Sequence, residues 1–117
     1  MRAYLAGPMR GRPEFNFPAF HRATALLRQA GHEVYSPAEA DLASGFDPTG
    51  YTGHEDIERD DRFDLRGALA GDLDYICRHA QAVVVLDGWE ASAGACAEVA
   101  TAVALGIPVF DLAELVP

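Results

Sequence analysis

The sequence predicts an α/β fold: one doubly wound parallel sheet of about four strands in the order 2-1-3-4, with helices on both faces. Three observations support this prediction. Short apolar runs alternate with longer amphipathic stretches, which indicates strands alternating with helices. The apolar runs are continuous, as in strands that are buried on both faces of a parallel sheet. The length of 117 residues suits a single domain, residues 1–117, with a single core.

The first segment is expected to form a strand, a loop and a helix. Residues 2–5 (RAYL) read as the strand, and residues 6–12 as a loop with two arginines. The loop lacks the glycine spacing of a dinucleotide fingerprint and the Gly-Lys-Ser/Thr of a P-loop. It is therefore either an anion-gripping turn or a plain β–α turn. Asn16 is the expected N-cap of a helix to about residue 29, with apolar residues on one face.

A second strand is predicted at residues 32–35, followed by one or two helical turns at 37–42. Residues 43–63 combine Gly, Pro, Thr and many acids without any periodicity, which predicts a lid or a partly disordered loop. Its acidic side chains are expected to form a solvated face: Asp56, Glu58, Asp60 and Asp61.

Residues 64–78 are predicted to be a helix, because leucines recur at helical spacing. Gly67 and Gly71 weaken this helix by about 1 kcal/mol each relative to alanine. Asp72 is either an exposed helical residue or a residue that faces the same crevice as the next strand.

The stretch from Ala82 to Gly106 organises the rest of the chain. A β-branched run to Leu86 predicts a buried strand, and a helix is expected from Ala95 to a C-cap at Gly106. Backbone N–H groups and the helix dipole converge where a loop meets a helix in this way, which makes an anion site. Glu98, about one turn into the helix, is either a partner of the dipole or a catalytic group.

A final strand is predicted at residues 107–110, with a helical turn at 111–115. The resulting topology is that of Rossmann-like and flavodoxin-like sheets. Its strand order reverses between the first and third strands, which places a ligand crevice at their carboxyl ends. Two loops leave these ends, at residues 7–12 and 87–94, so both are expected to border one site.

Composition limits the partners and the compartment. The net charge of −9 and the pI of about 4.6 exclude a nucleic-acid polymer or an anionic membrane as partner. Cys77 and Cys96 are not spaced as a metal or redox pair and are expected to be reduced thiols of the core. A strand that starts at residue 2 leaves no room for a signal peptide, and no apolar run has membrane-spanning length. A cytoplasmic protein without metal or organic cofactor is expected.

The order of the short motifs resembles the nucleoside 2-deoxyribosyltransferase-like superfamily. The likeness extends over roughly residues 1–37 and 64–111, and it is strongest to nucleoside 5′-monophosphate N-glycosidases and small phage and bacterial relatives. The matching segments are YLAGPMRG, Asp72-Leu73, AVVVL, GWExSxGA, Ser92-x-Gly-x-x-x-Glu98 and ALGIPV.

The resemblance implies a set of site residues. Glu98 matches the nucleophile, Asp72 matches the acid that assists at the nucleobase, and Tyr4 matches a tyrosine near the sugar or base. The residues implied in binding the substrate and its phosphate are Gly7, Pro8, Met9, Arg10, Gly11, Asp87, Trp89, Ser92 and Gly94.

The identity of residue 92 bears on the substrate. Transferases that act on free nucleosides carry an aspartate at this position for the 5′-hydroxyl, whereas this chain has Ser92. A carboxylate would repel a phosphate, but a hydroxyl, the Gly94 amide and a helix N-terminus would bind it, with Arg10 as counter-charge. The resemblance therefore implies hydrolysis of the N-glycosidic bond of a (deoxy)nucleoside 5′-monophosphate, giving free base and sugar 5-phosphate.

Alternatives remain at this point. The chain is also compatible with a deoxyribosyltransferase that exchanges bases. A non-catalytic nucleotide-binding module is favoured by Pro8, where the glycosidases often carry a serine. A flavodoxin-like or response-regulator-like signalling domain fits poorly, because residues 7–12 contain no Ser or Thr and the chain has no Lys. The resemblance further implies a homodimer or a higher homo-oligomer.

Overall fold

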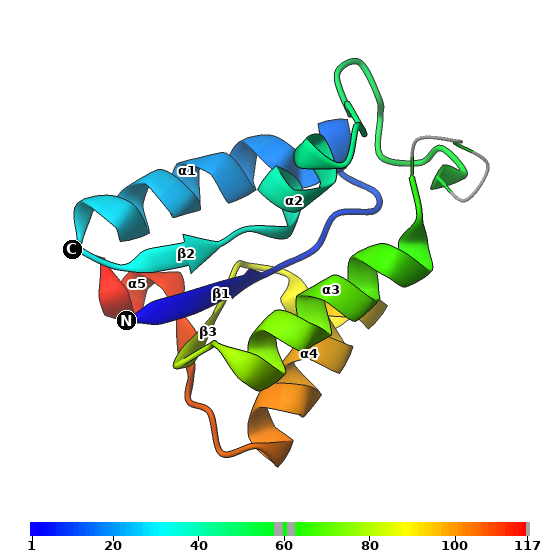
Figure 1. Ribbon diagram of the computed structural model, residues 1–117. Coiled ribbons are helices and arrows are strands. Elements are labelled where there is room, and N and C mark those ends of the chain that lie inside the picture. Colours follow the sequence, from blue (N-terminus) through cyan, green and yellow to red (C-terminus); the bar gives the residue numbers. More distant parts are fainter. Residues whose placement is uncertain (58–59, 61–62, 117) are drawn as a thin grey trace.

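The strands form the sheet that the sequence predicts. A computed structural model describes residues 1–57, 60 and 63–116. Four parallel strands pair in the order β2-β1-β3-β4, which confirms the predicted order (Figure 1). The strands are β1 (Arg2–Ala6), β2 (Glu33–Tyr35), β3 (Ala82–Val85) and β4 (Val109–Asp111).

The two central strands are buried on both faces, as their continuous apolar runs predicted. Tyr4 in β1 lies opposite Tyr35 on one side and Val83 on the other. Because side chains alternate between the faces of a sheet, Tyr4 points to one side and Leu5 to the other. Each face packs against its own core cluster, and Tyr4 and Leu5 belong to different clusters.

Helices cover both faces. On the side of Leu5 lie α1 (Phe17–Gln29), α2 (Pro37–Ala43) and α5 (Leu112–Leu115); on the side of Tyr4 lie α3 (Leu65–Arg78) and α4 (Ala93–Ala104). In Figure 1 the sheet is seen nearly edge-on between α1 and the pair formed by α3 and α4. α2 stands at the carboxyl end of β2 and contacts both α1 and α3. This position brings α2 close to the Tyr4 side of the sheet.

The helix starts follow local capping chemistry. The Asp64 carboxylate accepts a hydrogen bond from the Gly67 amide at 3.0 Å and caps α3. The Ser92 hydroxyl accepts one from the Ala95 amide at 3.2 Å, so α4 begins at Ala93, ahead of the predicted start. Asn16 precedes α1 as expected, but its amide donates to the Pro8 carbonyl at 2.8 Å instead of capping the helix. The reason is its left-handed backbone, which ends the short 3-10 turn Pro13–Asn16.

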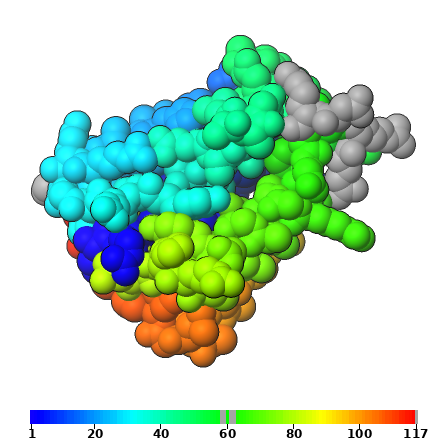
Figure 2. Space-filling view, viewed as in Figure 1, coloured from blue at the N-terminus to red at the C-terminus, as the bar shows by residue number. Residues whose placement is uncertain are grey.

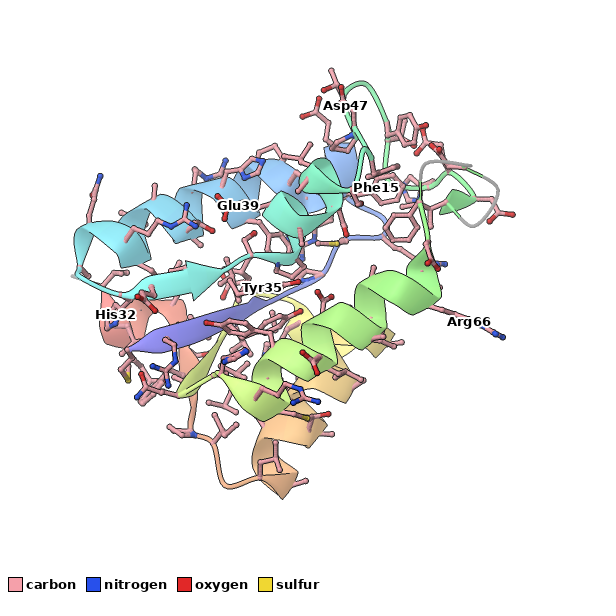
Figure 3. The ribbon with its side chains drawn as sticks, viewed as in Figure 1. Phe15, His32, Tyr35, Glu39, Asp47 and Arg66 are labelled. Atoms are coloured by element: carbon pink, nitrogen blue, oxygen red, sulfur yellow. The ribbon has the colours of Figure 1, made fainter. Side chains whose placement is uncertain are left out.

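The described part of residues 43–63 is attached to the core and is not a detached lid. Phe46 is 1% exposed, and its ring makes edge contacts with Phe15 and Tyr51. Figure 3 shows Phe15 at this end of the molecule. The Gly11 amide donates to the Gly53 carbonyl at 2.8 Å, which joins the segment to the loop after β1. The sequence did not predict this attachment to the core, because the aromatic residues of the segment are scattered among polar ones.

The predicted solvated face of acids holds only in part. Asp56 is exposed, whereas Asp60 is half-buried and accepts a hydrogen bond from the Tyr51 hydroxyl at 2.6 Å. Glu58 and Asp61 lie outside the described residues.

Candidate functional site

A buried hydrogen bond between the sheet and α4 lies at the centre of the candidate site. The Tyr4 hydroxyl donates to Glu98 Oε2 at 2.7 Å, and the Glu98 residue is 6% exposed. Glu98 shares the inward face of α4 with Ala95 and Ala102, which are its neighbours at helical spacing. These small residues let α4 approach the sheet closely enough for the carboxylate to reach the tyrosine.

Asp72 lies beside this pair. It is 8% exposed and projects from the inward face of α3, one turn before the buried Ile76. Its carboxylate interacts with the hydroxyls of Tyr4 and Tyr35 and with Glu98. The structure thus brings together Tyr4, Asp72 and Glu98, the three residues that the resemblance implied for catalysis.

Burial decides the protonation of the two acids. It raises the pKa of Glu98 to about 8, against the opposing effect of the Tyr4 hydrogen bond, and the charge of Asp72 adds to the increase. Burial also raises the pKa of Asp72 to about 6, opposed by hydrogen bonds with Tyr4 and Tyr35. The acids titrate as a coupled pair, which therefore holds about one proton near neutral pH.

The helix N-terminus contributes little to the charge state of Glu98. α4 begins at Ala93, so Glu98 lies beyond the first turn, where the dipole acts most strongly. Desolvation is the largest influence on its pKa. A raised pKa, such as that of Asp72, suits a proton donor that works near neutral pH.

A third buried acid, Asp41 in α2, was missed by the sequence reasoning. It is 7% exposed, and burial followed by the charge of Asp72 raises its pKa to about 7. One signal was available, because Asp41 lies three residues after Ala38 and so shares its helix face, which is buried. The sequence did not show that this face meets the acid of a distant helix.

A pocket of about 420 Å³ opens between α2 and α3, and Figure 2 shows the hollow between their surfaces. Asp41 and Asp72 both line it, but Glu98 is not among its lining residues. Tyr35 forms part of the wall between β2 and α3 (Figure 3). Its ring stacks on Tyr4 at 5.6 Å and on Tyr75 at 4.6 Å between centroids. The complete lining is Tyr35, Ala40, Asp41, Ser44, Phe63, Asp64, Gly67, Ala68, Gly71 and Asp72.

Burial raises the pKa of Tyr35 to about 12, with a contribution from the charge of Asp72, and it raises the pKa of Tyr4 well above the usual range. Both phenols therefore stay protonated at neutral pH and act as hydrogen-bond donors to the acids.

The loop after β1 is shaped mainly by packing. Gly7 is buried, and a Cβ there would lie 2.9 Å from the Cβ of Leu86, so glycine permits the close approach of the ends of β1 and β3. Pro8 is buried and Met9 is half-buried against the core. Arg10 and Gly11 are exposed.

The loop after β3 approaches the loop after β1 through Arg12. The Arg12 guanidinium abuts Gly88 and donates to the Asp87 carbonyl at 3.5 Å. The resemblance implied Arg10, which precedes Gly11, whereas Arg12 contacts the second loop through the Asp87 carbonyl. Trp89 is half-buried and packs against the core.

The N-terminus of α4 offers hydrogen-bond donors. Ser92 uses its hydroxyl oxygen as the N-cap, whereas the amides of Ala93 and Gly94 have no intrahelical partner because they belong to the first turn. Across the described residues, none of those implied in phosphate binding lines the pocket between α2 and α3. The two groups of predicted residues therefore occupy different neighbourhoods.

The comparisons with known proteins identify a family. Residues 1–111 match DUF4406, which is described as a domain of unknown function. The chain belongs to the DUF4406 family. No curated protein gives a significant match. The description of the family names no activity, so the chemistry of this DUF4406 domain rests on its own geometry.

Several other properties of the DUF4406 domain bear on the expectations. In the described residues, no three or more His, Cys, Asp or Glu side chains are arranged to hold a metal ion. Cys77 and Cys96 are unpaired, but both are exposed, so their assignment to the core is wrong. Both lie on the outward faces of helices that are covered on one side only. None of the described helices is long and apolar enough to cross a membrane.

Proposed function

We propose that this DUF4406 domain hydrolyses the N-glycosidic bond of a (deoxy)nucleoside 5′-monophosphate, with Glu98 as nucleophile and Asp72 as proton donor. One observation carries the proposal: the buried hydrogen bond from Tyr4 to Glu98, with Asp72 beside it at the wall of a pocket. Two carboxyl groups of different pKa, buried next to each other, are the arrangement that glycoside cleavage uses.

The reaction needs one ionised and one protonated carboxyl group. Glu98 would attack the anomeric carbon as the bond to the base breaks, and the bonding electrons would pass to the base nitrogen, which takes the proton of Asp72. Water would then cleave the glycosyl ester, returning its proton to Asp72 and leaving Glu98 as a carboxylate. A pair with pKa values of about 6 and about 8 carries the required single proton near pH 7.

Substrate binding has to move this proton, because Glu98 has the higher pKa of the two acids. Positive charge develops at the anomeric carbon during cleavage, and it would favour an ionised Glu98. The Tyr4 hydroxyl would stabilise the carboxylate through the bond to Oε2 and leave the other oxygen available for attack.

We assign the phosphate of the substrate to the side of the site that the loops after β1 and β3 border. The first-turn amides of α4 at Ala93 and Gly94 suit an anion, and Arg12 lies beside the same loop. The base is assigned to the pocket between α2 and α3, which Asp72 lines. The reacting carbon would then lie between the two, close to Glu98.

A chromatographic assay of base release tests the proposal. Nucleoside 5′-monophosphates and the matching free nucleosides are incubated with wild type, Glu98→Gln and Glu90→Gln, the last being an exposed glutamate on the turn Trp89–Ala91 that serves as matched control. We expect wild type and Glu90→Gln to release base from a monophosphate and Glu98→Gln to release none. Release from nucleosides alone would refute the phosphate assignment, and sugar transfer to an added second base would establish base exchange.

A non-catalytic nucleotide-binding module is the second candidate. It is favoured by the burial of Glu98 and by its absence from the lining of the pocket. Under this alternative no base is released from any substrate, while a monophosphate still raises the melting temperature by mass action.

A further inference from the structure

The pocket between α2 and α3 contains a carboxyl group that the fold leaves without a donor. Asp41 is 7% exposed and lines the pocket. Its backbone carbonyl accepts from the Ser44 hydroxyl and from the Phe46 amide. Its side chain, in contrast, receives no hydrogen bond or ion pair from any residue in the described part of the chain. A buried carboxyl group without a donor is costly, so its position calls for a ligand.

The other acids of the pocket are occupied. Asp64 accepts from the Gly67 amide as the cap of α3. Asp72 interacts with Tyr4, Tyr35 and Glu98. Asp41 is therefore the acid that is available to a molecule entering the pocket.

The wall opposite α2 is formed by small residues of α3. Gly67 and Gly71 line the pocket from successive turns of α3, and Ala68 lies between them. A Cβ on Gly71 would meet only the Tyr35 hydroxyl, at 3.9 Å, so the absence of a side chain there leaves open space that packing does not require. Gly67 is required by packing, because a Cβ there would collide with the capping Asp64 carboxylate. Gly71 is therefore the glycine that weakens the helix without a packing reason, and it clears a surface against which a planar ring can lie.

We propose that Asp41 binds a purine through a ring N–H and the adjacent exocyclic amino group, the pair of donors that guanine carries. The inference rests on the proposed function for the assignment of the base to this pocket, and it deepens that function by naming the class of base.

The chemistry follows from the acceptor geometry of a carboxylate. Its two oxygens accept two parallel N–H donors, whereas an ionised carboxylate has no proton to donate. Guanine offers two such donors side by side. Hypoxanthine lacks the amino group, and xanthine carries an oxo group at that position, which would oppose the carboxylate oxygen without a hydrogen between them. A volume of about 420 Å³ is within the range of small-molecule sites.

Calorimetric titration with three nucleotides tests the inference. Guanosine and inosine 5′-monophosphates differ only in the group next to the ring N–H and are the matched pair, whereas xanthosine 5′-monophosphate carries an oxo group there and also ionises in the ring. All proteins carry Glu98→Gln to prevent turnover, and the titration is run at pH 8, above the pKa of about 7 of Asp41. We expect guanosine monophosphate to bind roughly tenfold or more tightly than the other two, as one charge-assisted hydrogen bond implies.

Two variants distinguish Asp41 from the general acidity of the pocket. Asp41→Asn keeps the shape but replaces one acceptor with a donor, so the preference should fall to less than about twofold. Asp64→Asn removes the same charge from the same pocket and still caps the helix, since asparagine is an equally good cap, so the preference should persist. Circular dichroism confirms that both variants are folded.

The outcomes separate the two proposals. Equal affinity for the three nucleotides, a preference that survives Asp41→Asn, or no binding at all would each overturn the role of Asp41. Preferential binding of guanosine monophosphate without base release by wild type would support Asp41 and refute the glycosidase. Base release by wild type with equal affinities for the three nucleotides would support the glycosidase and refute the role of Asp41.

Discussion

The protonation of Glu98 makes a prediction about stability that is independent of any substrate. Its folded pKa of about 8 lies above the ordinary value of 4.5, because burial disfavours the charged form. The folded protein therefore binds more protons than the unfolded chain between these two values. The resulting stabilisation is fully present below pH 4.5 and is lost as the pH rises towards 8 and beyond.

The magnitude follows from these two values. Between pH 5 and pH 9 the difference in proton binding at this one group lowers the free energy of unfolding by about 4 kcal/mol. That amount is a large part of the total stability of a small domain. Glu98→Gln removes the titrating group but keeps an oxygen that accepts from the Tyr4 hydroxyl. The variant should therefore gain about 4 kcal/mol relative to wild type over this pH range.

The assay is urea unfolding of both proteins at pH 5, 7 and 9, and the quantity compared is the difference between their free energies of unfolding. Groups that do not interact with Glu98 titrate alike in both proteins, so their contribution cancels in this difference, whereas that of the coupled Asp72 does not. Glu90→Gln is the matched control, because Glu90 is exposed and its difference from wild type should stay nearly constant. A difference between wild type and Glu98→Gln that changes by less than about 1 kcal/mol would show that Glu98 is not held in a desolvated site.

Three further predictions follow from the same region. Gly71→Ala should raise the free energy of unfolding by roughly 0.5 to 1 kcal/mol in thermal or urea unfolding, because its Cβ has open space near the Tyr35 hydroxyl; a loss of stability would mean that the pocket wall is closed. Tyr4→Phe should raise the pKa of Glu98 further, since it removes the hydrogen bond that lowers this pKa; a carboxyl-detected NMR titration with a lower value would contradict the geometry. If the glycosidase proposal holds, a plot of kcat/KM against pH should be bell-shaped with limbs near pH 6 and pH 8, because Asp72 and Glu98 must hold one proton between them. A profile that is flat from pH 5 to 9 would count against this pair.

Much of the fold was predictable because its signals are local or follow general topological rules. The continuous apolar runs of β1 and β3 are readable in the sequence, since strands buried on both faces need them. The strand order was predicted because 2-1-3-4 is a common order of small doubly wound sheets, and the structure has this order. Glu98 and Asp72 were candidates because they lie in short motifs that resemble those of a known superfamily. The structure brings both next to Tyr4.

Other features depend on contacts between residues that are distant in the chain. In the sequence, Asp41 is an ordinary residue of a short helix. Only the contact of α2 with α3 at the carboxyl end of β2 places it in the pocket. Arg12 is distinguished from Arg10 only by the loop that it reaches. Phe46 is a core residue because its ring packs against that of Phe15, which is distant in the sequence.

The sequence by itself determined the alternation of strands and helices and made Asp72 and Glu98 candidates for chemistry. These properties follow from the spacing of residues along the chain. The tertiary structure alone decided that Asp41, Asp72 and Glu98 are all buried with raised pKa values, and that two of them line one pocket. Desolvation is the reason, because it depends on the packing of three helices and a sheet around each group, and no local pattern records that packing.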